Sequence, residues 1–145
     1  MFPVEEVELI CREFETAVPL QALAEHLGAS MNQAQALYSA GIISPLIPPG
    51  GPGSVRKVVF GRSHLNGFLS RIEAMEVVPA EFRGEIVSIS VACQREGGTT
   101  PDLVQAIWDR RIMAWRDPLH TGLRSILVRL CDVRVLRERA GRALA

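Results

Sequence analysis

Two stretches of the sequence carry hydroxyl and amide side chains at helical spacing, and such side chains can hydrogen-bond the edges of DNA bases. Gln and Asn pair with adenine, Arg pairs with guanine, and Ser or Thr contacts a base or a phosphate. The candidate contacts are Ser30, Asn32, Gln33 and Gln35 in the first stretch, and Thr99, Thr100, Gln105, Arg110 and Arg111 in the second. Plain solvation of a polar face is an equally good reading. Asp102 and Asp109 also oppose close approach to phosphate unless neighbouring arginines pair with them.

Basic side chains beside two loops rich in Gly and Pro are candidates for binding the DNA backbone. Lys and Arg contacts to phosphate give affinity without reading the base sequence. These residues are Arg56, Lys57 and Arg62 near the first loop, and Arg116 and Arg124 on either side of the second. A charged hairpin that only keeps the protein in solution is the alternative. The later arginines are predicted to form a solvated helix face: Arg129, Arg134, Arg137, Arg139 and Arg142.

The sequence carries no pattern that indicates catalysis, a metal or a cofactor. The stretch Gly50-Gly51-Pro52-Gly53 contains a proline and is not followed by a Lys-Ser or Lys-Thr pair, so it does not predict a phosphate-binding loop. The three histidines, His26, His64 and His120, are widely separated and have no cysteine at metal-ligand spacing. We therefore expect a protein that is not an enzyme, has no metal and needs no cofactor.

The remaining reactive or aromatic residues are predicted to be structural. The cysteines Cys11, Cys93 and Cys131 are odd in number and far apart, which favours buried, reduced thiols in a cytoplasmic protein. The aromatic residues at helix or strand positions are predicted to pack in the core: Tyr38, Phe60, Trp108 and Trp115. No apolar run approaches about 18 residues, and the acidic start lacks a basic region before an apolar stretch. We therefore expect neither a membrane span nor a secretory signal.

Charge is segregated along a chain that is neutral as a whole. The 145 residues include 16 basic and 16 acidic side chains, and 48% hydrophobic residues support a packed core. Residues 1–28 carry a net charge of −5, residues 29–72 of +4, residues 73–102 of −4 and residues 103–145 of +5. A local basic stripe attracts a polyanion whatever the total charge. Neutrality therefore does not exclude nucleic acid as a partner.

The double alternation of charge coincides with a repeat of about 69 residues. Residues 18–28 align with residues 87–97, and each segment reads as a short helix that ends at a glycine. The other predicted helices are residues 31–40 and 63–73 in the first copy, and 100–111 and about 131–139 in the second. Between them lie predicted hairpins, with strands at 42–47 and 55–60, and at 112–115 and 123–128. Each copy is thus a helix-turn-helix followed by a wing.

The predicted fold class is mainly α with small β wings, an α+β chain of two tandem winged helix-turn-helix units. The predicted divisions are an acidic N-terminal helix at 1–14, a first unit at 15–73, a connector at 74–84, and a second unit at 85–145 that ends in a basic helix. The connector is punctuated by Pro79 and Gly84.

The first copy, from Val18 through Gly28 and Tyr38 to Ile43, resembles the opening of MerR-type and phage excisionase-type winged helix-turn-helix domains. The second copy, from Val87 to Ile112 and on to Val128, resembles the same class. The resemblance implies DNA binding, with the second helix in the major groove and the wing on the flanking backbone. The chain departs from full MerR regulators because it lacks their long coiled coil and ligand-binding cysteines, and its first copy has few basic residues on the second helix. It also resembles, more weakly, C-terminal segments of TniQ-like transposition proteins, without their zinc-binding pattern.

Two classes of function follow as hypotheses. The first is non-catalytic binding of double-stranded DNA, in transposition, recombination or transcription regulation, with no membrane partner and no small-molecule ligand. In this reading Gln33 and Gln35 read bases while Arg110 and Arg111 anchor phosphates. The second is a protein–protein interaction module built on winged-helix units, because the fold alone does not decide what it binds.

Overall fold

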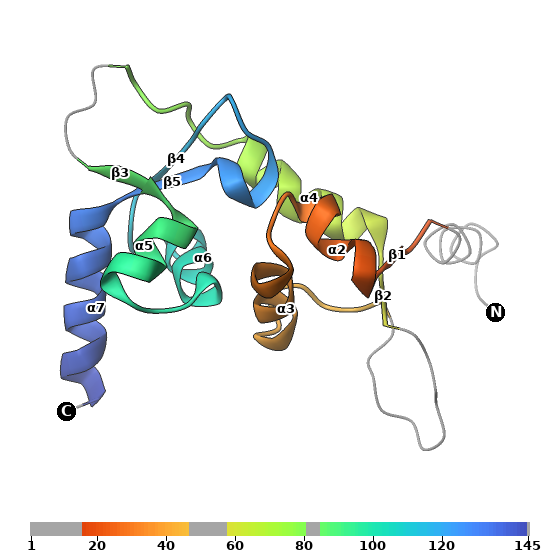
Figure 1. The fold of residues 1–145 in the computed structure, drawn as a ribbon, viewed down its shortest axis with the longest axis horizontal. Helices are drawn as coiled ribbons and strands as arrows, with labels where there is room; N and C mark the ends of the chain where they lie inside the picture. The colour runs from red at the N-terminus through yellow and green to blue at the C-terminus, as the bar shows by residue number, and fades with distance from the viewer. Residues whose placement is uncertain (1–15, 47–57, 81–84, 145) are drawn as a thin grey trace, which may run out of the picture. The chain divides into compact units, whose positions relative to one another are not determined.

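The structure is a computed structural model that describes residues 16–46, 58–80 and 85–144 (Figure 1). The chain divides into two compact units, Met1–Ser70 and Arg71–Ala145. The described residues are mainly helical, with one small antiparallel sheet in each unit, as the fold class predicted. The predicted N-terminal helix, the first wing loop, Cys11, Arg56 and Lys57 lie outside the described residues.

The first unit pairs two short helices with a two-stranded sheet. Its elements are β1 (Val18–Pro19), α2 (Leu20–Leu27), α3 (Met31–Ser39), β2 (Val59–Phe60) and α4 (Arg62–Glu73), whose last residues fall in the second unit. Gly28 closes α2 with φ of 62°, a left-handed conformation that glycine adopts without a steric penalty. Ser30 then begins α3 with a capping box. Leu23, Leu27 and Leu37 are fully buried beneath this turn and form the core between the helices.

The second unit has the same plan with a larger sheet. Its elements are β3 (Ile86–Ser88), α5 (Ile89–Glu96), α6 (Thr100–Trp108), β4 (Ala114–Arg116), the 3-10 helix η1 (Gly122–Ser125), β5 (Ile126–Arg129) and α7 (Leu130–Leu144). The strands are antiparallel in the order β3-β5-β4. Ile89, Leu103, Ile126 and Val128 are buried between the sheet and the helices.

Strand pairing follows the repeat seen in the sequence. Val18 pairs with Phe60 in the first unit, and Val87 pairs with Val128 in the second. Equivalent residues of the two units are therefore 69 positions apart before the wing loop, as Val18 and Val87 are, and 68 positions apart after it, as Phe60 and Val128 are. The backbone N–H of Leu46 donates to the carbonyl oxygen of Val59 at 2.9 Å, at the place equivalent to the β4–β5 pairing. The two units therefore share this register, but residues 42–46 of the first unit form no strand where β4 stands in the second, so the predicted strand at 42–47 is wrong over its described residues.

The structure corrects several predicted boundaries in the second unit. α6 ends at Trp108 rather than Arg111, because the chain turns at Asp109 and enters a left-handed conformation at Arg110. Residues 122–125 form a 3-10 turn rather than strand, with the hydroxyl of Ser125 donating to the carbonyl oxygen of Gly122 at 2.6 Å. Part of the predicted connector also joins β4, where the N–H of Arg116 donates to the oxygen of Glu76 at 2.8 Å.

Candidate nucleic-acid interface

The polar residues of α3 divide into a capping pair and an exposed face. The N–H of Gln33 donates to the hydroxyl oxygen of Ser30 at 3.1 Å, and the N–H of Ser30 donates to Oε1 of Gln33 at 3.0 Å. These two side chains therefore fix the start of the helix. Asn32 and Gln35 are exposed, with no charged residue between them. Of the contacts predicted on α3, these two side chains remain available to a base edge.

Two other described side chains of the first unit, those of Arg62 and His64, hold its loops. Nε of Arg62 donates to the carbonyl oxygen of Thr16 at 3.2 Å, which ties the start of α4 to the segment before β1. The N–H of Ser44 donates to Nε2 of His64 at 3.2 Å. Arg62 remains exposed and keeps its charge at the surface, whereas His64 has a structural role.

The exposed face of α6 is acidic and internally bonded. The hydroxyl of Thr99 caps the helix by accepting from the N–H of Asp102 at 3.3 Å. Nε2 of Gln105 donates to Asp109 at 2.9 Å. Asp109 also lies 3.6 Å from the Arg111 guanidinium. Two carboxylates on one face disfavour entry of α6 into a groove lined by phosphates.

Thr100 is buried and does not face solvent as a DNA contact would. It lies beside Cys93, where burial raises the pKa of the thiol above its ordinary value and a hydrogen bond with Thr100 partly opposes that shift. Cys93 is half-buried, but Cys131 is exposed, so the prediction that the thiols are buried is wrong for Cys131.

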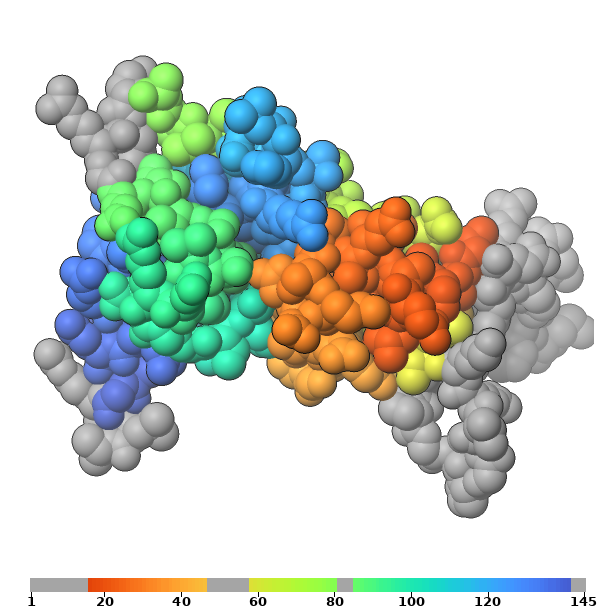
Figure 2. Space-filling model, in the orientation of Figure 1, coloured from red at the N-terminus to blue at the C-terminus, as the bar shows by residue number. Residues whose placement is uncertain are grey.

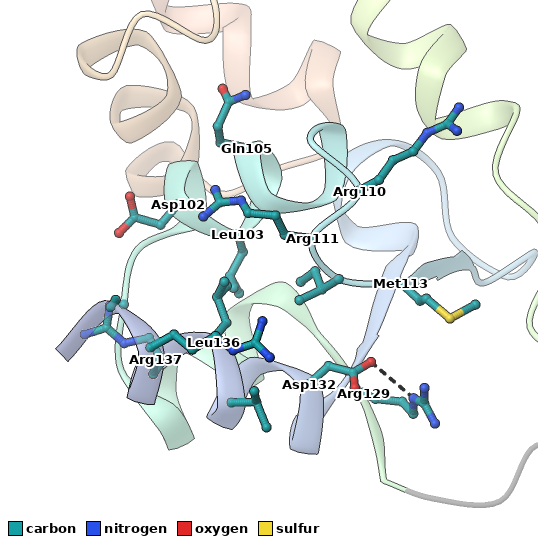
Figure 3. Close-up of a pocket in the computed structure, with 15 residues that line it drawn as sticks. Asp102, Leu103, Gln105, Arg110, Arg111, Met113, Arg129, Asp132, Leu136 and Arg137 are labelled. Atoms are coloured by element: carbon teal, nitrogen blue, oxygen red, sulfur yellow. Dashed lines mark hydrogen bonds and ion pairs between the residues drawn. The ribbon is translucent and has the colours of Figure 1, made fainter. Parts of the chain in front are cut away.

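Five arginines surround one cavity of about 880 Å³ between α6 and α7 of the second unit (Figure 3). They are Arg110, Arg111, Arg129, Arg137 and Arg139. Two aspartates, Asp102 and Asp132, lie on the same lining, so positive charge predominates. α7 lies at the surface of the second unit, which leaves its arginines accessible (Figure 2).

The five arginines differ in how far their charges are already compensated. Nε of Arg129 donates to Asp132 at 3.2 Å, and Arg111 lies near Asp109. Within the described part of the chain, Arg110, Arg137 and Arg139 form no ion pair. All three are exposed. Their charges are thus available to an anion from solution.

The arginines also differ in direction. In Figure 3, Arg111 extends from the turn after α6 along the side of that helix, and Arg137 extends from α7 toward the α5–α6 turn. Arg110 and Gln105 point away from α7. A Cβ on Gly98, which has φ of 99°, would lie 3.3 Å from Cδ of Arg137. The missing side chain therefore lets Arg137 lie close over the α5–α6 turn.

Arg110 adopts a backbone conformation that is unfavourable for an arginine. Its φ is 60°, and among the described residues it is the one non-glycine residue with positive φ. The equivalent residue of the first unit is Gly41, with φ of 80°. A residue held in this region costs free energy that the surrounding fold must supply, and such positions concentrate at functional sites.

The second wing exposes one of its two predicted arginines more than the other. Arg124 lies exposed on η1. Arg116 is half-buried, and its Nε is buried without a hydrogen-bond partner among the described groups. Leu119 is 87% exposed at the loop, where its N–H donates to Asp117 at 2.9 Å. Arg124 is therefore the better placed contact for a phosphate.

The aromatic residues mostly pack as predicted. Phe60 and Trp115 are buried, and Tyr38 meets Phe60 edge-on with ring centroids 5.5 Å apart. Trp108 is half-buried, and the guanidinium carbon of Arg71 lies 4.3 Å from its ring centroid within the second unit. No cluster of metal-binding side chains occurs among the described residues. No described helix has the length and apolar character of a membrane span.

Sequence reasoning missed three arginines of the cavity: Arg129, Arg137 and Arg139. They were predicted to be a solvated helix face, and the structure instead groups them with Arg110 and Arg111. The concentration of arginine after residue 109 was the available signal, but helical spacing does not show which neighbouring element a face meets.

Comparison with known proteins returns no match: no protein family, no curated protein and no solved structure corresponds to this chain. The resemblance to MerR-type and excisionase-type domains therefore rests on the residues quoted for it. A function has to be argued from the site itself.

Proposed function

We propose that this chain binds double-stranded DNA and catalyses no reaction. The observation that carries the proposal is the gathering of five arginines round one cavity beside a helix-turn-helix, in a chain with no net charge. Such a concentration of positive charge provides affinity for the phosphate backbone. A role in the cytoplasm, in transposition, recombination or transcription regulation, belongs to the same proposal.

The two units have different roles in this proposal. α3 exposes Asn32 and Gln35, whose amides can form paired hydrogen bonds with adenine in the major groove. α6 exposes Asp102 and Asp109, which repel phosphate. The first unit therefore reads the base sequence, and the arginines of the second unit anchor the backbone. Two units in one chain also raise the affinity of each for the same duplex through effective concentration.

The test is equilibrium binding of the full chain to labelled duplexes of about 20 base pairs, two helical turns, over a series of salt concentrations. A DNA-binding protein shows a log–log salt slope of about −0.9 for each phosphate it neutralises. Selection from a random duplex library then shows whether any base sequence is preferred. Affinity that is absent, or that does not change with salt, contradicts the proposal.

The competing candidate is a protein-interaction module, and exposed apolar residues favour it. Met113 and Val135 are 59% and 46% exposed and line the same cavity, and Leu119 is exposed on the wing. A protein partner would bury these side chains. Mutation of Met113 or Val135 to Ser would then abolish a partner complex, whereas affinity for duplex DNA would depend on the arginines.

A further inference from the structure

We infer that the cavity between α6 and α7 is a subsite for one phosphodiester group of a nucleic-acid strand, held chiefly by Arg111 and Arg137. The inference rests on the proposed function and makes it more specific, because it assigns the backbone contact to one place in the second unit. The sequence already made Arg110 and Arg111 candidates for anchoring phosphates but placed Arg137 on a solvated helix face, so the inference adds Arg137 and the cavity that it lines together with Arg111.

The chemistry of the lining fits a sugar-phosphate strand. A guanidinium is a planar fork of N–H donors that matches two phosphate oxygens. Arg111, in the turn after α6, and Arg137, on α7, both line the cavity (Figure 3). Leu103, Ile112 and Leu136 line the same cavity and offer an apolar surface for a deoxyribose. The volume of about 880 Å³ lies in the usual range for small-ligand sites.

The two aspartates leave the positive charge largely intact. Asp132 accepts a hydrogen bond from Arg129, so this carboxylate and this guanidinium compensate each other. Asp102 is exposed on α6 and carries the remaining negative charge of the lining. Against it stand Arg137 and Arg139, which have no ion pair among the described residues. An anion is therefore the partner that this lining lacks.

Comparison of the two units shows that the fold itself does not require these arginines. By the offsets of the strand pairing, Arg111 corresponds to Ile42. Arg137 lies after the wing loop, where equivalent residues are 68 positions apart, and it therefore corresponds to Leu69. A residue needed only for packing or helix capping would be expected in both copies. By the same offsets Arg139 alone among the five lining arginines has a basic counterpart, Arg71, so most of the basic lining has no equivalent in the first copy, which is what a dedicated binding site predicts.

The test compares single charge removals in the full chain, using the same labelled duplex and salt series. Arg111→Gln and Arg137→Gln should each weaken binding about eightfold at 0.1 M salt, because one lost phosphate contact lowers the salt slope by about 0.9. Arg134→Gln is the matched control. Arg134 is also an exposed α7 residue, but it is held by Glu96 at 2.8 Å and does not line the cavity. It should change affinity less than twofold.

The outcomes separate the inference from the proposed function. If the wild type binds the duplex and the cavity variants bind it with the same affinity as the Arg134→Gln control, the inference is overturned. The proposal of DNA binding is then still supported. No binding of any duplex by the wild type overturns both. Thermal melting of each variant checks folding, and Arg139→Gln supplies a third removal at the same lining. A fall in affinity without a fall in melting midpoint supports the inference.

A free nucleotide offers the same phosphate chemistry, and a competition arm distinguishes it from a strand. dAMP is titrated against the labelled duplex at constant ionic strength. A strand subsite predicts that dAMP competes only weakly, because it lacks the neighbouring phosphates. Displacement of the duplex by micromolar dAMP, lost in Arg137→Gln, assigns the cavity to a small molecule and overturns the inference.

Discussion

Replacement of Arg110 by glycine is expected to stabilise the second unit while weakening DNA binding. The φ of 60° at Arg110 lies in the left-handed region, which costs an L-residue about 1–2 kcal/mol and glycine very little. Glycine loses more conformational freedom on folding, which offsets about 0.5–1 kcal/mol of that gain. The net increase in the free energy of unfolding is therefore about 0.5–1 kcal/mol.

Both effects are measurable on the same variant. For a unit of this size the added stability raises the melting midpoint by about 2–8 °C, which circular dichroism or calorimetry detects. Loss of the guanidinium removes one exposed positive charge beside the cavity. If Arg110 contacts a phosphate, duplex affinity falls about eightfold at 0.1 M salt.

Two further variants separate backbone strain from charge. Arg110→Ala keeps the left-handed strain and removes the charge, so it should bind as weakly as the glycine variant without the gain in stability. Gly41→Ala introduces strain into the first unit, where φ is 80° and no described atom lies within 4 Å of the added Cβ. It should cost about 1 kcal/mol. A lower melting midpoint for Arg110→Gly would refute the strain argument, and wild-type affinity in both Arg110 variants would refute the role of its charge.

Three other predictions address helix capping, base reading and titration. Ser30→Ala should lower the free energy of unfolding by about 1 kcal/mol in denaturant melts, because it removes the capping box of α3. Gln35→Ala should change the preference between matched and mismatched duplexes by about 1–3 kcal/mol at one base pair, whereas Arg111→Gln should weaken both equally. Because the pKa of Cys93 is raised in the folded protein, the folded state keeps its thiol proton at a higher pH than the unfolded chain does. The associated stability, fully present below about pH 8.5, should decline as the pH rises through the thiol titration, and Cys93→Ala should remove this dependence from urea midpoints.

Local signals in the sequence were sufficient to predict the helix-turn-helix pairs. Ser30 and Thr99 each cap the second helix of their unit, as hydroxyl residues before an apolar periodic run indicate. Gly28 ends α2 in the left-handed conformation. These signals act within one helical turn, so neither depends on how the rest of the chain folds. The predicted fold class rests on these same local signals, and the structure confirmed it.

The end of α6 could not be predicted in this way. Asp109, Arg110 and Arg111 contain no glycine or proline that would indicate a stop, and arginine rarely adopts positive φ. The helix stops because the chain must turn to reach β4, where Ala114 pairs with Val128. That pairing joins distant parts of the sequence. Tertiary structure thus decides where α6 ends, a boundary that local helix propensity does not predict.

The cavity was also beyond sequence reasoning, because it depends on which faces of α6 and α7 meet. The spacing of Arg137 and Arg139 describes a position on one helix, and it predicts a solvated face as readily as a binding face. Gly98 contributes to this arrangement, because its lack of a side chain makes room for Arg137 beside α6. Gly98 follows Gly97, the residue that ends α5, and nothing in its position in the sequence indicated an effect on a residue 39 positions later.

The second helices of the two units make the clearest case for different roles. They occupy the same place in equivalent folds, yet the exposed amides Asn32 and Gln35 of α3 correspond to Pro101 and Val104 of α6, whose side chains cannot hydrogen-bond a base. A base-reading role is therefore open to α3 and closed to α6 at these two positions. Four of the five cavity arginines have uncharged residues at the equivalent positions of the first copy, such as Ile42 for Arg111, whereas Arg139 corresponds to Arg71. Because the helix-turn-helix backbone is shared, these differences lie in side-chain chemistry, and under the proposed function each unit supplies the part of duplex recognition that the other lacks.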